Sequence, residues 1–193
     1  MELVFATNNL HKLKELQQIL SCDVKLLSLS EIGCTEDIPE TENTLEGNAV
    51  LKAKYIFDRY GYPCFADDTG LEVDALNGEP GVFSARYAGE NKNADDNVEK
   101  LLQKMAGIKN RQARFRTVIC IIENGEKHLF EGEVKGVITL SRRGSSGFGY
   151  DPVFEPENSG KTFAEMNADE KNAISHRGRA VRKLADFILK YKK

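Results

Sequence analysis

The longest alternating segment of the chain limits its possible folds most strongly. Residues 111–136, RQARFRTVICIIENGEKHLFEGEVKG, alternate apolar and polar side chains on either side of Asn124-Gly125. Such alternation is the period of a strand with one buried face, and Asn-Gly is the pair that a two-residue type I′ turn favours. The sequence therefore predicts a long antiparallel β-hairpin, whose apolar face needs a core to cover it.

The rest of the chain mixes strand-like runs with helical patterns. Strands are expected at residues 2–7, 24–29, 63–68, 71–76 and 152–156. The expected helices follow residue types that cap helix N-termini: Asn8 or Asn9, Thr44, Asn93 and Ser175. Strands alternating with helices, plus one antiparallel hairpin, predict an α/β fold with a mixed β-sheet flanked by helices. One two-lobed domain over residues 1–193 is expected, because no linker-like stretch divides the chain.

Composition argues against several classes of protein. The net charge of -3 makes nucleic-acid binding the weakest functional candidate, so an anion site would need local positive charge. The four cysteines form no C-x-x-C pair, which argues against a zinc site or a disulfide framework and suits a reducing compartment. The N-terminus lacks a signal-peptide pattern, and no apolar run approaches about 18 residues. We therefore expect a cytoplasmic protein without a membrane anchor.

The segment ATNNLHK joins the first expected strand to the first expected helix. Thr7, Asn8 and Asn9 lie at the junction, and Lys12 follows one turn into the helix. Free N–H groups and the positive end of the helix dipole make such a junction an anion site. Simple helix capping explains the same residues and is common at these positions. The glycines of a Walker A loop or a Rossmann fingerprint are absent, so neither motif is inferred.

The segment EKNAISHRGRAVRKL begins the last helix with basic residues. Ser175 is the expected N-cap, His176 and Arg177 follow in the first turn, and Lys171 lies just upstream. Positive charge in a first turn opposes the helix dipole, so this pattern indicates that something negative lies nearby. A bound anion would explain it. So would ion pairs of the two longer cations with acidic neighbours: Glu165, Asp169 and Glu170.

Carboxylates gather around the stretch PCFADDTGLEV. Five are candidates for a hard cation such as Mg²⁺: Glu40, Asp67, Asp68, Glu72 and Asp74. Consecutive strand residues point to opposite faces of a sheet, so at most one member of the Asp67-Asp68 pair points into a given pocket. A polar strand end with one Asx-turn is the plainer interpretation of the same residues.

The stretch GSSGFGYDP combines glycines with aromatic residues. Its glycines allow close approach of a backbone, Phe148 and Tyr150 offer flat faces for stacking a base, and Asp151 offers an acceptor. A flexible loop before a strand is the alternative.

Taken together, the four segments supply what is needed to hold a nucleoside triphosphate with Mg²⁺. No Cys/His or Ser/His nucleophile motif is present, so direct attack by water is the simpler chemistry.

Six segments in order resemble one family along nearly the whole chain: FATNNLHKLKE, IPETENTLEGNAVLKA, ADDTGLEVDAL, GEPGVFSARYAG, SSGFGYDPVF and EKNAISHRGRA. They are similar to the inosine triphosphate pyrophosphatases (the Ham1-like, or RdgB-type, proteins). That family hydrolyses deaminated purine nucleotides (ITP, dITP, XTP) to the monophosphate and pyrophosphate, which cleanses the nucleotide pool. One departure is Asn8, where many relatives have glycine; asparagine tolerates similar backbone angles.

The resemblance implies a role for each matching residue. Asp68 would be the catalytic proton acceptor and a Mg²⁺ ligand, and Glu40 the second metal carboxylate. The triphosphate would meet one loop and one further lysine: Thr7, Asn8, Asn9, Leu10, His11, Lys12 and Lys52. Thr69 would also contact the substrate. The nucleobase pocket would comprise Phe148, Gly149, Tyr150, Asp151, Lys171, His176 and Arg177.

The resemblance also implies an elongated mixed sheet, with two lobes around a central cleft, and a homodimer. A Maf-type pyrophosphatase, with a related fold and other nucleotide substrates, is the enzymatic alternative, although the FGYD and SHR motifs favour the first family. A non-catalytic nucleotide sensor is the other alternative, and the intact Glu40 and Asp68 argue against it. The sequence leaves open the preference among ITP, XTP and dITP, the number of metal ions, and the roles of Asp67, Glu72 and Asp74.

Overall fold

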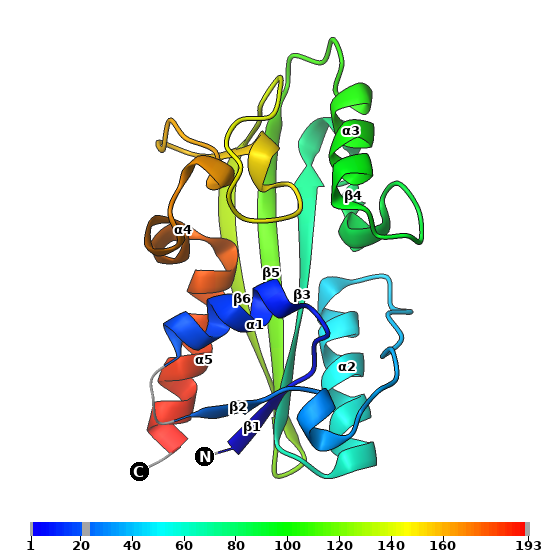
Figure 1. The fold of residues 1–193 in the computed structure, drawn as a ribbon, viewed down its shortest axis with the longest axis vertical. Coiled ribbons are helices and arrows are strands. Elements are labelled where there is room, and N and C mark those ends of the chain that lie inside the picture. The colour runs from blue at the N-terminus through cyan, green and yellow to red at the C-terminus, as the bar shows by residue number, and fades with distance from the viewer. Residues whose placement is uncertain (1, 21–23, 192–193) are drawn as a thin grey trace. The chain divides into compact units, whose positions relative to one another are not determined.

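The structure, a computed structural model, describes residues 2–20 and 24–191, so Cys22 lies outside the described residues. It confirms an α/β fold in which helices flank a mixed sheet (Figure 1). The strands are β1 Glu2–Phe5, β2 Lys25–Leu27, β3 Cys64–Val73, β4 Pro80–Gly81, β5 Gln112–Glu123, β6 Glu126–Ile138 and β7 Phe154–Pro156. The α-helices are α1 Leu10–Ile19, α2 Leu45–Tyr60, α3 Ala94–Lys104, α4 Ala168–Ile174 and α5 His176–Tyr191. Short 3-10 turns span Ser30–Ile32, Asp74–Leu76, Ser84–Arg86, Asp151–Val153 and Phe163–Glu165.

The sheet has the strand order β2-β1-β3-β5-β6-β7, with β4 paired to β3. β1 runs parallel to both β2 and β3, whereas β4 is antiparallel to β3 and β7 is antiparallel to β6. The predicted hairpin is β5–β6, and both residues of its turn have positive φ, 52° at Asn124 and 82° at Gly125. A type I′ turn requires this conformation at both positions, so the hairpin prediction is confirmed.

The chain divides into two compact units, and strands β3, β5 and β6 each contribute residues to both. The first unit comprises Met1–Asp68, Thr117–Gly132 and Arg177–Lys193. The second unit comprises Thr69–Arg116 and Glu133–His176. Each helix among the described residues is too short or too polar to span a lipid bilayer.

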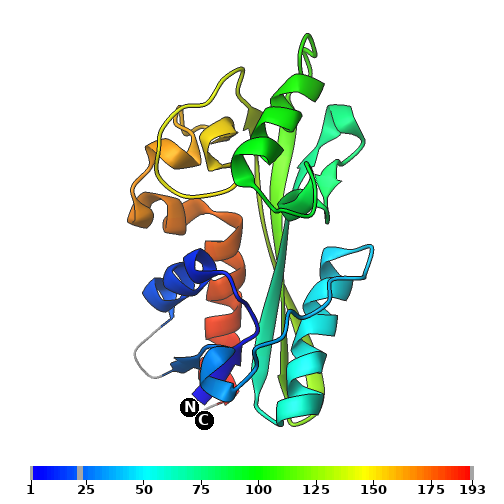
Figure 2. The ribbon, with the colours of Figure 1, turned by 45° about the vertical axis from the view of Figure 1, so that its right-hand side comes forward.

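The core of the first unit lies between β1, β3, β5 and the helices α1 and α5. Phe5 and Phe65 occupy paired positions of parallel strands and stack with ring centroids 4.6 Å apart. Leu16 of α1 and Leu184 of α5 are fully buried in the same cluster. Figures 1 and 2 both show α1 (blue) beside α5 (red). This packing brings the start of α1 and the start of α5 to the same face of β3.

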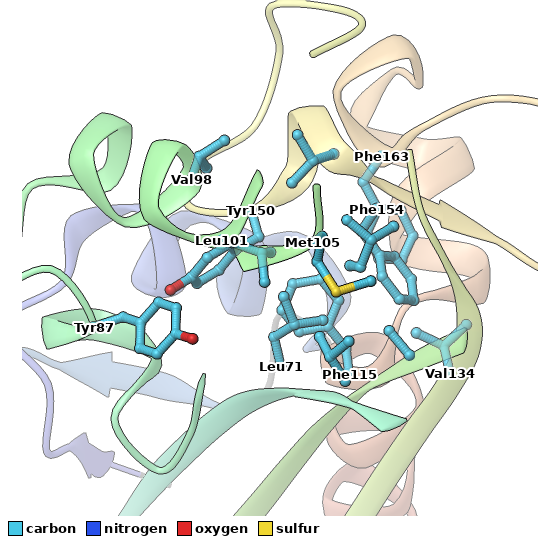
Figure 3. Packing of buried hydrophobic residues seen from close by; sticks show 14 of the residues in the cluster. Leu71, Tyr87, Val98, Leu101, Met105, Phe115, Val134, Tyr150, Phe154 and Phe163 are labelled. Atoms are coloured by element: carbon cyan, nitrogen blue, oxygen red, sulfur yellow. The ribbon is translucent and has the colours of Figure 1, made fainter. Parts of the chain in front are cut away.

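The core of the second unit lies between its part of the sheet, α3 and the segment around β7 (Figure 3). Leu101 of α3 and Met105, which follows its last residue, are fully buried in one cluster with Leu71 of β3. Phe115 of β5 packs edge-on against Phe154 at a centroid distance of 4.7 Å. These aromatic contacts fix the segment that carries several of the predicted base-binding residues.

Helix ends follow the sequence signals closely. Asn9, Thr44 and Asn93 each accept backbone N–H groups in the first turn of the helix that follows, as an N-cap does. Gly61 ends α2 in the left-handed conformation with φ of 70°, where glycine avoids the strain that a Cβ brings.

The structure differs from the sequence expectations in several places. The strand expected at residues 71–76 ends at Val73, and Asp74–Leu76 form a 3-10 turn. β3 continues through the Thr69-Gly70 step to Val73, because β3 is hydrogen-bonded to neighbouring strands that carry the ladder past it. The expected strand at residues 152–156 begins only at Phe154, after a 3-10 turn. Helix α4 was not expected. Its signal is the capping box between Asn167 and Glu170, which the sequence contains as NADE.

A close backbone approach explains one glycine of β6. A Cβ at Gly136 would lie 2.3 Å from the Glu155 carbonyl oxygen and 2.7 Å from the Phe154 ring, so β6 and β7 could not pair as observed. We predict that Gly136→Ala lowers the free energy of unfolding by about 3 kcal/mol, the upper end of ordinary overpacking costs. Chemical denaturation measures this loss.

The matched control is Gly61→Ala. The φ of Gly61 is unfavourable for alanine, unlike that of Gly136, but a Cβ at Gly61 meets nothing within 4 Å. Backbone strain alone costs about 1 kcal/mol, so equal losses in the two variants would contradict the steric explanation.

Candidate active site

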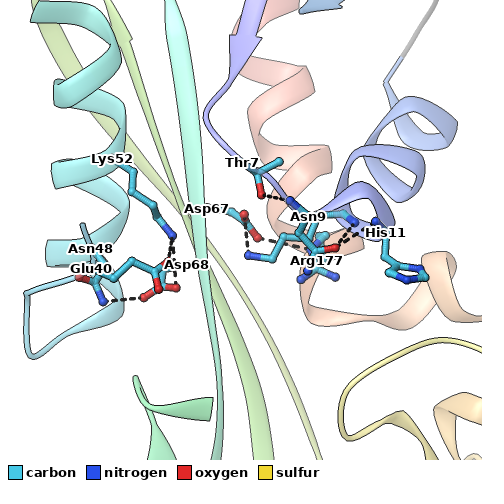
Figure 4. A network of polar contacts seen from close by, with 10 residues as sticks. Thr7, Asn9, His11, Glu40, Asn48, Lys52, Asp67, Asp68 and Arg177 are labelled. Atoms are coloured by element: carbon cyan, nitrogen blue, oxygen red, sulfur yellow. Dashed lines mark hydrogen bonds and ion pairs between the residues drawn. The ribbon is translucent and has the colours of Figure 1, made fainter. Parts of the chain in front are cut away.

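β3 separates its two adjacent aspartates onto opposite faces (Figure 4). Asp67 points toward α1 and α5, where it meets Lys12 and Arg177. Asp68 points toward α2, where it meets Asn48 and Lys52. The prediction that the two side chains point to opposite faces of the strand is therefore confirmed, and all of these residues lie in the first unit. We call them, together with Glu40, the polar cluster.

Asp67 is a buried carboxylate with two cationic partners. Its side chain is 1% exposed, and its oxygens lie 2.9 Å from Lys12 Nζ and 3.5 Å from Arg177 Nε. Burial raises the pKa of Asp67, but these cations, helped by Lys52, outweigh burial and hold the pKa well below its usual range. Asp67 is therefore a permanent anion at neutral pH.

Asp68 is in the opposite electrostatic situation. Burial raises the pKa of Asp68 above its usual value, and the ammonium of Lys52, 3.5 Å away, offsets this only in part. Asn48 Nδ2 donates to Asp68 Oδ2 at 3.0 Å, and the Asn48 amide oxygen accepts from the Glu42 backbone N–H. The carboxylate is thus oriented, partly desolvated and a stronger proton acceptor than an ordinary aspartate.

Lys52 lies between two carboxylates. Its Nζ is 2.6 Å from Glu40 Oε1 and 3.5 Å from Asp68 Oδ1. Burial lowers the pKa of Lys52, but Asp68 and Glu40 outweigh burial and raise it above its ordinary value. The structure thus places the two predicted metal carboxylates and Lys52 together.

The loop before α1 has the capping geometry that the sequence left open. Asn9 Oδ1 accepts from the backbone N–H groups of His11 and Lys12, at 3.0 and 3.3 Å. The Thr7 hydroxyl accepts from the Asn9 N–H, and Asn8 donates to Asp37. Asn9 therefore caps α1, and this fixes the loop beside the Lys12-Asp67 pair. The side chain of Leu10 lies outside the described residues.

The second unit holds a separate group, which we call the aromatic cluster: Phe115, Phe148, Asp151, Phe163, Lys171 and His176. Asp151 Oδ2 accepts from Lys171 Nζ at 2.7 Å and from the Phe148 backbone N–H at 2.8 Å. The Lys171 ammonium also lies 4.7 Å from the centre of the Phe148 ring, a cation–π distance. Asp151 is thus the residue that ties the Gly-rich loop to α4.

His176 and Tyr150 are both buried, in different ways. The His176 ring stacks on Phe115 at 4.6 Å with an angle of 13° between the planes. Tyr150 is 5% exposed in the hydrophobic core, and its hydroxyl donates to the Ser84 carbonyl. The expectation that Tyr150 offers a flat face for stacking is therefore wrong, since core side chains surround its ring. Thr69 and Gly149, two further predicted substrate contacts, are partly exposed.

The Gly-rich loop is built tightly, contrary to the alternative of a flexible loop. A Cβ at Gly147, where φ is 76°, would lie 2.1 Å from Asp151 Oδ2. A Cβ at Gly144 would lie 2.3 Å from the Ala164 carbonyl oxygen. The Ser146 N–H donates to that same carbonyl, so residues 144–151 are fastened at both ends.

The basic residues near Ser175 have partners other than those the sequence suggested. Lys171 pairs with Asp151, and Arg177 pairs with Asp67, 110 residues away in the chain. Glu165 and Glu170, two of the acidic neighbours considered, each complete a capping box instead. The positive charge of the first turn of α5 is therefore compensated from β3.

Sequence reasoning missed the contribution of Asn48 and could not assign Asp67. A signal for Asn48 exists, because it lies four residues before Lys52 on α2 and so shares its face. The partners of Asp67 leave no local signal, since they come from two other elements.

The carboxylates present fit a divalent cation that also binds substrate phosphates. Glu40 and Asp68 both contact the Lys52 ammonium, so their oxygens already converge on one positive charge. Within residues 2–20 and 24–191, no group of three or more His, Cys, Asp or Glu side chains could hold a metal. Mg²⁺ suits such a two-carboxylate site, because it commonly takes its remaining ligands from water and phosphate.

Comparison with known proteins places these residues in a family context. The model of the Ham1 family matches residues 3–187. A dITP/XTP pyrophosphatase of Flavobacterium johnsoniae is 58% identical over 188 residues, which cover 97% of this chain and 98% of that protein. One of Porphyromonas gingivalis is 58% identical and covers 97% of each chain.

Solved structures agree with the fold. The Staphylococcus aureus Ham1 protein superposes with a TM-score of 0.91 at 41% identity over 100% of both chains. A Ham1 protein of Coxiella burnetii gives a TM-score of 0.91 at 39% identity, over 98% of this chain and 99% of that one.

The depressed pKa of Asp67 yields a prediction for stability in metal-free buffer. A group with a lowered folded-state pKa stabilises the protein above its unfolded pKa, about 4, and this contribution is lost as pH falls toward the folded value. We predict that Asp67→Asn costs about 3 kcal/mol of unfolding free energy at pH 7, since it removes the anion that faces Lys12 and the buried Arg177. The difference from the unmodified protein should shrink as pH falls from 5 to 2.

Denaturant unfolding at a series of pH values measures this difference. Asp58→Asn is the matched control, because Asp58 forms an exposed pair with Lys54 on α2 and should change stability little at any pH. A constant deficit for Asp67→Asn across the whole range would contradict the prediction.

Proposed function

Because the chain belongs to the Ham1 family, we propose that it is a nucleoside triphosphate pyrophosphatase that hydrolyses deaminated purine nucleotides. The substrates would be ITP, dITP and XTP, and the products the nucleoside monophosphate and pyrophosphate. One observation carries the proposal most directly. Asp68 is a buried, oriented carboxylate with a raised pKa, beside a lysine and a second carboxylate. Those are the properties of a general base that works next to phosphate and metal.

The triphosphate would bind to the polar cluster. Lys12 and Lys52 bring two ammonium groups to opposite faces of β3, and the capped start of α1 adds the positive end of a helix dipole. Burial lowers the pKa of Lys12, and Asp67 opposes that effect. The carboxylates of the cluster match its cations, so the net positive charge for an anion would come from bound Mg²⁺ and the dipole of α1.

Glu40 and Asp68 would hold Mg²⁺ together with phosphate oxygens. The metal, when bound, supplies neutralisation of the charge that develops on the phosphates. Asp68 accepts a proton from the water that attacks the α-phosphorus, and Asn48 keeps the carboxylate turned for that role. Pyrophosphate then leaves from the same group of lysines.

The nucleobase would be recognised by the aromatic cluster, and the family resemblance adds Arg177 as a contact. Phe148 is half-buried and supplies the flat face, while Asp151 and Lys171 fix the loop that carries it. His176 and Arg177 carry N–H donors that suit a 6-oxo group. A 6-amino group would meet them donor to donor, and buried polar groups left unpaired cost a few kcal/mol, or about a hundredfold or more in rate.

The remaining proposals rest on the family resemblance. They are a homodimer, a cytoplasmic location and Mg²⁺ as the cofactor, with no nucleic-acid or membrane partner. The net charge of -3 agrees with the lack of a nucleic-acid partner.

A substrate panel tests the proposed function. With Mg²⁺, we expect ITP, dITP and XTP to release pyrophosphate about a hundredfold faster, in kcat/KM, than ATP. GTP shares the 6-oxo group, so its expected rejection tests a separate contact at position 2 of the purine. Removal of Mg²⁺ with a chelator should stop the reaction, and excess Mg²⁺ should restore it.

Three outcomes would refute the proposal. Equal rates on all five nucleotides would contradict the proposed base preference. Release of orthophosphate would contradict the proposed attack at the α-phosphorus. Binding of ITP without turnover would favour a nucleotide sensor.

Replacement of the proposed base gives a second test. Asp68→Asn should lower kcat by about a hundredfold or more, as loss of a general base does. Much of the fold should persist, because Lys52 keeps Glu40 as an ion-pair partner at 2.6 Å. Pyrophosphate release and thermal unfolding measure the two effects. Retained turnover would assign the base to another residue.

A further inference from the structure

Two helices of the first unit begin with a cation and have no acidic residue of their own in the first turn. Lys12 is the third residue of α1, and Arg177 is the second residue of α5. Each cation opposes the dipole of its helix, and each is buried or nearly so. Such an arrangement costs stability unless a negative group lies close to both helix starts.

Asp67 is that negative group. Its two oxygens are divided between the cations, with Oδ1 at 2.9 Å from Lys12 Nζ and Oδ2 at 3.5 Å from Arg177 Nε. With 1% of its side chain exposed, Asp67 is closed off from a ligand by the groups that it holds. It therefore acts on other residues: Lys12, which is 14% exposed, and Arg177, which is 3% exposed.

We propose that Asp67 is a positioning residue that sets Lys12 and Arg177 in place for the substrate before it arrives. The proposal rests on the proposed function, in which Lys12 meets the triphosphate and Arg177 meets the purine. One carboxylate would then align the cation that binds phosphate and the cation that selects the base. Its adjacent residue Asp68, on the other face, does the chemistry.

The alignment has a physical reason to matter. Lysine and arginine side chains carry much rotamer freedom, and a fixed carboxylate removes it before binding. A misplacement of about 1 Å in such groups can cost about a hundredfold in rate. Loss of Asp67 should therefore lower kcat/KM for dITP by about a hundredfold. It should also weaken the preference for dITP over dATP by about tenfold, since Arg177 would no longer be held in place.

The test is a set of double-mutant cycles with Mg²⁺ and the full chain. Asp67→Asn is combined with Arg177→Met and, separately, with Lys12→Met, and kcat/KM is measured for dITP and dATP. The ratio between the two nucleotides does not depend on the folded fraction, so a merely structural loss would leave it unchanged. If Asp67 acts through its partners, the effects are not additive. In the Arg177→Met background, Asp67→Asn should leave the ratio as it was, and in the Lys12→Met background it should lower kcat/KM by less than about tenfold.

Asp58→Asn is the matched control. It makes the same change of residue in the first unit, in an exposed pair with Lys54 on α2 at 2.6 Å, outside the proposed site. This variant should keep both the rate and the ratio. If Asp67→Asn alone fails to fold, the Asp67→Asn, Lys12→Met double variant removes one cation with its anion, and the ratio is measured in that background.

The outcomes separate this inference from the function it rests on. An unmodified protein that does not prefer dITP, or whose preference Arg177→Met leaves unchanged, refutes the proposed substrate or the role of Arg177. If the unmodified protein prefers dITP but Asp67→Asn keeps the ratio, Asp67 is a structural anion only. Additive losses in both cycles would also overturn the positioning role.

Discussion

The buried anion of Asp67, with cations from two helices, is the interaction on which the polar cluster depends. A carboxylate that is 1% exposed would be strongly destabilising alone, and so would the buried Arg177 beside it. Together they form a compensated group that ties β3 to the first turns of α1 and α5. The capped loop before α1 is held beside this group, and so is the start of the helix that carries Arg177.

Alternation along β3 then creates two environments from two identical residues. Asp67 has two cationic partners and its pKa falls, whereas Asp68 has one ammonium at 3.5 Å and an amide, and its pKa rises. Neither direction follows from the residue type, because desolvation acts on both in the same sense. The difference lies in what each face of the sheet brings to the strand. A stable anion and a proton acceptor can thus be neighbours without sharing a function.

Short sequence patterns predict turns and helix caps well, but they do not predict ion pairs between residues far apart in the chain. The Asn124-Gly125 turn and the caps at Asn9, Thr44 and Asn93 depend on a few adjacent residues, so the sequence shows them directly. The strand period likewise fixed the opposite directions of Asp67 and Asp68. The Arg177-Asp67 pair joins residues 110 positions apart, and nearer carboxylates were equally plausible from charge alone. The roles of the site residues came from the family resemblance, since periodicity carries no information about a substrate.

The Gly-rich loop shows why composition alone misjudges rigidity. Glycines usually indicate freedom, yet here Gly144 and Gly147 permit contacts that a Cβ would prevent, and these contacts fasten the loop. Asp151 accepts from the Phe148 N–H and from Lys171, so the backbone next to Phe148 is fixed by a buried ion pair. The cation over the Phe148 ring adds a further restraint on its plane. In the polar cluster and in the aromatic cluster, a buried aspartate (Asp67 or Asp151) thus fixes the groups that we propose to contact the ligand.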